Sequence, residues 1–281
     1  MNLSFILDKL PWRLQSYLGY RPIKSITARE YFGNQYSSPN LQSEFITKVL
    51  PGGKINLKPA ISLNDFEHKH FTEITEKQYD ECLFFSLNNA KFVQHNLLPT
   101  VIDCKNRLIS DANKDPKKGR ELHPIFTVSK LNKPKKLDGK VLLLSTDGGH
   151  NGYFHWMCRI LPKLWVLEHF NISIDEFDYI LVNAGDFKFK HVSFEEFNIP
   201  KEKIIYTENE EVFHCNQLFI INNIRYHIEG IEFLKNRFLL IAATAIFLIT
   251  SNPLISDQMM SYLEVGQLKK SVDDVKKADG D

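Results

Sequence analysis

Three side chains that could carry out acid–base and phosphate chemistry are spaced four residues apart: His155, Arg159 and Lys163. On a helix this spacing places them on one face. Histidine changes its charge near neutral pH and can take a proton from a hydroxyl group, whereas arginine and lysine bind phosphate or an acidic sugar. The pattern therefore predicts a polar face that could activate a hydroxyl group beside an anion. The solvated face of an ordinary amphipathic helix has the same pattern, and this simpler interpretation stays open.

A glycine-containing turn precedes these residues. The apolar run VLLLST is followed by Asp147 and two glycines, and Asn151 belongs to a residue type that often caps helices. We therefore predict a helix that starts near Gly152, at the carboxyl edge of a parallel strand, where its free N–H groups favour anionic ligands. Asp147 is a second candidate for the general base. The candidates to contact a substrate at the turn are Gly148, Gly149 and Asn151.

The predicted helix extends to about His169, and we expect most of it to be buried. Its apolar side chains recur at spacings of three and four residues, as in a helix that packs on a core. They are Tyr153, Met157, Ile160, Leu164 and Leu167, and Phe154, Leu161 and Trp165 widen the same face. Pro162 lacks an N–H group and would clash with the carbonyl of Cys158, so we expect a kink there.

The elements that must position this helix alternate between strands and helices. VLLLST, FDYILVN, EKIIYT and CNQLFIIN are mostly apolar runs typical of buried parallel strands, and KFKHVSFEEFN and IEGIEFLKNRFL have helical spacing. This alternation predicts an α/β fold with a parallel sheet over residues 141–250. Asn183, at the end of the second run, is a further candidate to contact a substrate.

The rest of the chain divides by composition into other regions. Residues 1–40 look like a lead-in of helix and loops, 41–130 are β-rich, 131–140 resemble a linker and 251–281 form a charged helical tail. The β-rich region includes the predicted hairpin TVIDCKNRLISD, with Lys105 and Asn106 in its turn. It also includes ECLFFSLNNAKFVQH, which we interpret as two strands on either side of Asn88 and Asn89.

The overall composition excludes several classes of protein. The formal net charge of +1 over 281 residues gives no sign of a nucleic-acid binder. The four cysteines form no CxxC pair, so we expect neither disulfides nor a metal site, and a reducing cytoplasm fits. The apolar run from Phe238 to Thr250 is shorter than the roughly 20 residues of a spanning helix. An amphipathic helix over 4–17 could touch the inner face of a membrane, but we expect it to pack on the domain.

Several segments, in order, resemble glycosyltransferase family 61, which includes capsular polysaccharide biosynthesis proteins. NGYFHWMCRILPKLWVLE is similar to the family's N-x-(Y/F)-H-W … LP(R/K)L signature, and YILVNAGDFKFKHVSFEEFNIPKEKII is similar to the segment after it. The hairpin TVIDCKNRLISD and the helix IEGIEFLKNRFL also fit, so the resemblance covers roughly residues 92–239. Asn151 and His155 match the motif's Asn and His, Pro162 matches its proline, and Arg159 and Lys163 fall at its polar positions.

The resemblance implies a Rossmann-like domain that corresponds to the N-terminal half of a GT-B fold. It also implies transfer of a sugar from a nucleotide-sugar donor to a glycan acceptor, with no essential metal and no cofactor beyond the donor itself. The family's second half, with its "ISR" strand and "HGAGL" turn, has no counterpart after Leu239, so we expect a truncated fold. The alternative to a glycosyltransferase is therefore a non-catalytic remnant or binding module, and the sequence does not predict an oligomeric state.

Overall fold

Four parallel strands form the part of the sheet that positions the predicted site. They are β8 (Lys135–Leu143), β9 (Tyr179–Asn183), β10 (Ile204–Thr207) and β11 (Val212–Ile221). In the sheet they lie in the order β11-β8-β9-β10. The carboxyl-terminal halves of β8, β9 and β11 are mostly apolar and buried, whereas β10, at the end of the sheet, is half-buried except for Thr207. The four parallel strands predicted from the apolar runs are confirmed, and the fold is mixed α/β.

The computed structural model describes residues 21–56, 76–112, 123–128, 130–224 and 227–238. Contacts divide the chain into two units, Met1–Ile231 and Glu232–Asp281, and the sheet belongs to the first. The predicted helix over 4–17, the apolar run after Phe238 and the tail over 251–281 lie outside the described residues. Residues 228–238 are helical, as predicted for IEGIEFLKNRFL.

The segment between β8 and β9 is helical but not a regular α-helix throughout. It consists of α5 (Tyr153–His155), the π-helical turn η3 (Trp156–Ile160) and α6 (Pro162–His169). The amide of Leu161 donates to the carbonyl of Trp156, five residues back, at 3.1 Å. Pro162 cannot donate and its ring would crowd the preceding turn, so the irregularity expected at this proline takes the form of a wider π turn.

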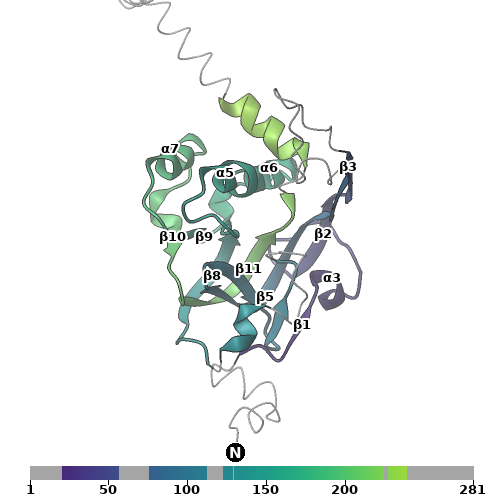
Figure 1. Ribbon diagram of the computed structural model, residues 1–281, viewed down its shortest axis with the longest axis vertical. Helices are drawn as coiled ribbons and strands as arrows, with labels where there is room; N and C mark the ends of the chain where they lie inside the picture. The colour runs from purple at the N-terminus through teal and green to yellow at the C-terminus, as the bar shows by residue number, and fades with distance from the viewer. Residues whose placement is uncertain (1–20, 57–75, 113–122, 129, 225–226, 239–281) are drawn as a thin grey trace, which may run out of the picture. The chain divides into compact units, whose positions relative to one another are not determined.

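The remaining helices are short except for α7 (Lys188–Glu196), which connects β9 to β10 as predicted. Figure 1 shows α7 as a neighbour of α5, and ring contacts between them confirm the packing. The others are α3 (Ala28–Tyr31) and the 3₁₀ turns η2 (Pro124–Thr127), η4 (Ile174–Glu176) and η5 (Lys201–Lys203).

An antiparallel group of strands continues the same sheet beyond β11. It consists of β5 (Cys82–His95), β2 (Phe45–Leu50), β6 (Leu98–Ile102), β7 (Arg107–Ile109) and β1 (Lys24–Ile26), with β1 parallel to β7. A separate pair is formed by β3 (Gly53–Asn56) and β4 (Glu76–Tyr79). The hairpin predicted around Lys105 and Asn106 is confirmed as β6–β7, and Asn106 has φ +58°.

Two sequence-based predictions for this part are wrong. ECLFFSLNNAKFVQH forms one long strand, β5, because β11 pairs with it on both sides of Asn89. Residues 131–140 are not a linker, since β8 starts at Lys135 and its first residues pair with β11. Polar composition suggested a break in both segments, whereas pairing with β11 supplies the hydrogen bonds that keep them extended.

The sheet bends where three neighbouring strands are irregular at the same level. Asn89 in β5 has φ +52°, Gly139 in β8 has φ +118°, and the register of β11 shifts between Cys215 and Gln217. Between the pairs that Cys215 and Gln217 form, β8 has one residue more than β11, and an extra residue of this kind bends a strand and increases its twist. The bend explains how residues 208–211 alone connect β10 to β11, although β8 and β9 lie between these two strands in the sheet.

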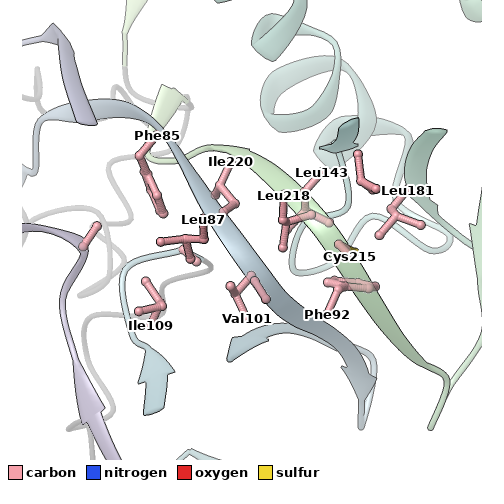
Figure 2. Packing of buried hydrophobic residues seen from close by; sticks show 14 of the residues in the cluster. Phe85, Leu87, Phe92, Val101, Ile109, Leu143, Leu181, Cys215, Leu218 and Ile220 are labelled. Atoms are coloured by element: carbon pink, nitrogen blue, oxygen red, sulfur yellow. The ribbon is translucent and has the colours of Figure 1, made fainter. Parts of the chain in front are cut away.

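The main hydrophobic core fills the inside of this bend. Figure 2 shows residues of β5, β6, β8, β9 and β11 pointing into one cluster. Phe85, Leu87, Val101, Leu143, Leu181, Cys215, Leu218 and Ile220 are all fully or almost fully buried. Because both groups of strands contribute to one core, residues predicted as separate regions pack together within the first unit.

Replacing Gly139 by alanine is expected to destabilise the fold by about 2–3 kcal/mol. A Cβ atom at Gly139 would lie 2.2 Å from Oδ2 of Asp178, and its φ of +118° disfavours any side chain. Gly33→Ala is the matched control, because Gly33 also has a positive φ, +60°, but open space around it. Chemical denaturation measures both variants, and an equal loss in the two would contradict the steric explanation.

Candidate functional site

The turn after β8 follows the edge of the neighbouring strand before it reaches α5. The amides of Leu144 and Ser145 both donate to the carbonyl of Leu181, at 2.9 and 3.0 Å. The amide of Gly149 then donates to the carbonyl of Thr146 at 3.2 Å, and Gly148 has φ +74°. The segment after β8 therefore forms a tight turn, as predicted from its two glycines.

Asn183, at the end of β9, holds this turn in place. Its Nδ2 donates to the carbonyl of Thr146 at 2.9 Å, and the amide of Thr146 donates to its Oδ1 at 2.8 Å. A Cβ atom on Gly149 would lie 2.1 Å from the same Oδ1, so only glycine permits this approach. Asn183 is fully buried and joins β8 to β9 instead of facing a ligand.

His155 lies directly over the glycines of the turn. Cβ atoms on Gly148 or Gly152 would lie 2.5 and 2.7 Å from Cδ2 of His155, so both glycines make room for the ring. The side chain is half-buried. The helix cap is Gly152, with no side-chain hydrogen bond, so the prediction that Asn151 caps the helix is wrong. Asn151 is instead exposed beside the turn.

Arg159 reaches back to the start of the turn. Its Nη1 donates to the carbonyl of Asp147 at 3.1 Å and lies 3.7 Å from the carboxylate Oδ2. The Asp147 side chain is 44% exposed and that of Arg159 only 18%. The turn therefore presents a half-exposed carboxylate with a guanidinium behind it, next to the ring of His155.

Lys163 does not belong to the polar face that the spacing predicted. It is buried, and its Nζ lies 3.1 Å from the carbonyl oxygens of Leu144 and Ser145 and 3.4 Å from that of Leu143. Three donors of an ammonium group suit three carbonyl oxygens, but burial lowers the pKa of Lys163 to about 7. The π turn alters the helical register, so His155 and Lys163 do not share one face.

Lys190 has the same arrangement at the next strand, and sequence reasoning missed it. Its Nζ donates to the carbonyls of Asn183 and Ala184, at 3.1 and 2.9 Å. The side chain is buried beneath the rings of Trp156 and Phe187, and burial lowers its pKa to about 8. Two buried lysines thus donate hydrogen bonds to the carbonyl groups that end β8 and β9. Nothing in the spacing of KFKHVSFEEFN distinguishes Lys190 from Lys188.

A buried polar network lies behind the turn and was also missed. The Thr207 hydroxyl lies 3.0 Å from the carbonyl of Val182, 3.3 Å from Oε1 of Gln94 and 3.4 Å from the hydroxyl of Ser145. The signal for part of it was in the sequence, because the runs that form β8, β9 and β10 each end in polar residues. Gln94 gave no signal, since only the bend of the sheet brings β5 to this place.

His150 extends this network towards the turn. Nε2 of its ring lies 3.2 Å from Nε2 of Gln94 and 3.5 Å from Nδ2 of Asn183. Both amide nitrogens are donors, so this ring nitrogen accepts and the imidazole is neutral. Burial lowers the pKa of His150, which keeps it neutral at physiological pH. His150 is a structural acceptor in this arrangement.

The structure brings most of the predicted site residues together, but in two layers. Asp147, Gly148, Asn151, His155 and Arg159 surround the outer side of the turn. Gly149, Asn183 and Lys163 support it from within. Cys158 is half-buried, and burial raises the pKa of its thiol, so it is not an activated nucleophile.

Two further results concern the part of the chain that the structure describes. In that part, no three His, Cys, Asp or Glu side chains are grouped so that they could hold a metal ion. No helix among those residues combines the length and apolar composition needed to cross a membrane.

Comparisons of the chain with protein-family models, with curated proteins and with solved structures found no match in any of the three. The relation to glycosyltransferase family 61 therefore stays a prediction that depends on the sequence motifs alone.

Proposed function

We propose that this chain binds a nucleotide-sugar at the turn after β8 and transfers the sugar to a surface or capsular glycan. The observation that carries the proposal is the cluster of His155, Asp147 and Arg159 at the carboxyl end of a parallel strand. Numbered along the chain from β8, the four parallel strands lie in the order 3-2-1-4, which is also the order of the first four strands in doubly wound nucleotide-binding sheets. In such sheets ligands bind beyond the carboxyl ends of the strands.

The proposed reaction needs one base and one cation. His155 takes the proton from a hydroxyl group of the acceptor glycan as that oxygen bonds to the anomeric carbon of the donor. The bond from this carbon to the diphosphate oxygen breaks, and the electron pair leaves with the nucleoside diphosphate. Arg159 stabilises the negative charge that develops on the leaving group. Asp147 is the alternative base. The exposed side chain of Asn151 can form a hydrogen bond with a sugar hydroxyl group.

The proposed reaction takes place in the cytoplasm. The helix predicted to be able to touch the inner face of the membrane, residues 4–17, lies outside the described residues. The four cysteines carry free thiols, two of them buried. Free thiols persist in a reducing compartment.

A non-catalytic binding module is the second candidate, and one observation favours it. Two of the residues expected to contact substrate, Lys163 and Asn183, are buried and hold the backbone of the turn. Of the cations predicted for the site, this leaves Arg159 to meet a diphosphate. A module that binds a glycan or nucleotide without chemistry needs no base.

Calorimetric titration of the purified chain with UDP-, GDP- and CMP-sugars tests donor binding, which the glycosyltransferase requires and a glycan-binding module does not. We expect one donor class to bind, and Arg159→Ala to weaken that binding roughly tenfold or more, since a charge-assisted hydrogen bond contributes about 1.5–3 kcal/mol. Arg107→Ala is the control, because Arg107 pairs with Asp103 away from the turn. If no common nucleotide-sugar binds, the glycosyltransferase proposal is wrong.

A further inference from the structure

Four aromatic side chains gather at the surface beside the turn, and the function proposed above does not use them. We call Tyr153, Phe154, Phe187 and Phe189 the aromatic platform. Tyr153 and Phe154 were predicted to be core residues, but they are 58% and 67% exposed. Large apolar side chains that remain exposed together mark a surface that binds something.

The platform is built on a rigid foundation. The Tyr153 and Phe189 rings meet edge to face with centroids 5.3 Å apart, and Phe187 stacks on Phe189 at 5.4 Å. Below them, buried Trp156 contacts Phe189 at 5.8 Å and Phe194 at 5.1 Å. The Trp156 Nε1 also donates to the hydroxyl of Ser193 at 3.2 Å. The rings of Tyr153, Phe187 and Phe189 are therefore held by α5, η3 and α7 together, whereas the exposed ring of Phe154 contacts the ring of His155 beside them.

Polar groups border the platform. Asn151 is exposed just before α5, and Asp186, 94% exposed, bonds through Oδ1 to Nε2 of His191 at 2.6 Å. Asp186 and exposed Lys188, on either side of Phe187 in sequence, carry opposite charges. An anionic membrane surface would select a cluster of lysine and arginine instead. Flat apolar rings edged by amide and carboxylate groups suit a neutral sugar, whose ring has an apolar face and hydroxyl groups around it.

We propose that the aromatic platform is the binding site for the acceptor glycan, with sugar rings stacked on Tyr153 and Phe154. Phe154 connects this surface to the candidate base, because its ring centroid lies 5.7 Å from that of His155. A sugar stacked there would present a hydroxyl group next to the residue proposed to deprotonate it. This inference rests on the proposed function and adds the acceptor side of the site.

The test uses the full chain and an array of oligosaccharides built from common hexoses and N-acetylhexosamines, followed by saturation-transfer NMR with the best binder. The Tyr153→Ala/Phe154→Ala double variant is expected to lose roughly tenfold or more in glycan affinity, as two aromatic contacts contribute about 0.5–1.5 kcal/mol each. Val192→Ala, which removes another exposed apolar side chain of α7, should bind like the wild type. Tyr153→Phe should also retain most of the affinity, because it keeps the ring.

Each outcome decides the proposal. Binding of glycan by the wild type that only the double variant loses supports it, and unchanged binding of nucleotide-sugars by that variant shows that the donor site is separate. Failure of donor binding alone would refute the transferase but leave the glycan platform intact. Absence of binding to any glycan on the array overturns the platform. Two other results also overturn the proposal. If the wild type binds phosphatidylcholine–phosphatidylglycerol vesicles and the double variant does not, the rings bind a membrane. If the wild type forms dimers in sedimentation and the double variant does not, the rings bind a second copy of the chain.

Discussion

The wild-type protein is expected to gain about 2 kcal/mol of unfolding free energy between pH 7 and pH 9 relative to the Lys163→Met variant. The pKa of Lys163 is about 7 in the folded chain against an ordinary value of 10.5. Between these values the unfolded chain binds a proton that the folded chain does not, so stability rises with pH. Below pH 7 the folded state carries the buried charge and the full cost of burying it. Urea denaturation at a series of pH values measures the difference.

The surroundings of Lys163 explain why its burial is costly. Its polar contacts are the carbonyl oxygens of Leu143, Leu144 and Ser145, and the ionisable group that influences its pKa is Cys82. Burial raises the pKa of the Cys82 thiol, so at neutral pH it is uncharged and offers no counter-charge. Methionine has similar length and no charge, and therefore removes the dependence without a large cavity.

Two other lysines serve as controls for the assignment of this pH dependence to Lys163. Lys136→Met, at a side chain that is 66% exposed, should keep the wild-type pH dependence. Lys190 is also buried with a lowered pKa, of about 8, so it contributes in the same direction in both proteins and cancels from the difference. Parallel stability curves for wild type and Lys163→Met would show that Lys163 keeps its proton throughout this range.

Sugar transfer is expected to fall by about 10²–10⁴-fold when His155 is replaced by phenylalanine. Phenylalanine fills the space over Gly148 and Gly152 that the imidazole occupies, but it cannot accept a proton. The variant should therefore fold and bind the nucleotide-sugar, while its turnover number falls. Turnover with the donor class found by titration and a glycan from the array measures the effect.

The control for this experiment is His169→Phe, at the end of α6, where the histidine is exposed and stacks on Trp165. It should turn over at the wild-type rate. If His155→Phe also retains full activity, His155 is not the base, and Asp147→Asn becomes the next variant to measure. If both retain activity, the turn after β8 does not carry the chemistry.

The sequence was informative wherever one physical pattern dominated a segment. Continuous apolar runs placed β8, β9, β10 and β11, because a strand covered on both faces excludes polar side chains. The pattern of α7 and the turn of β6–β7 were predictable for similar local reasons. The glycine turn was also predictable, since Gly148 and Gly149 fill conformations and contacts that no larger residue tolerates.

Local patterns failed where long-range contacts decide. Helical spacing put Lys163 on a polar face with His155, but the π turn before Pro162 changes the register and points Lys163 at the strand carbonyls. The same spacing predicted that Tyr153 and Phe154 lie in the core, whereas both side chains are exposed and Tyr153 packs against Phe189 of α7. A helical repeat fixes which residues share a face only while the hydrogen-bond pattern stays regular.

The four parallel strands, the glycine turn and the residue types available for chemistry can be recognised in the sequence, because they depend on neighbours within a few positions. Which of those residues lie side by side depends on the folded chain. The bend through Asn89, Gly139 and Cys215 brings Gln94 to the end of β10. Burial places Lys163, predicted on a polar face, and Lys190, for which no role was predicted, against the carbonyl groups that end β8 and β9. The reason is that burial and pairing depend on contacts between segments far apart in the chain, which no local spacing records.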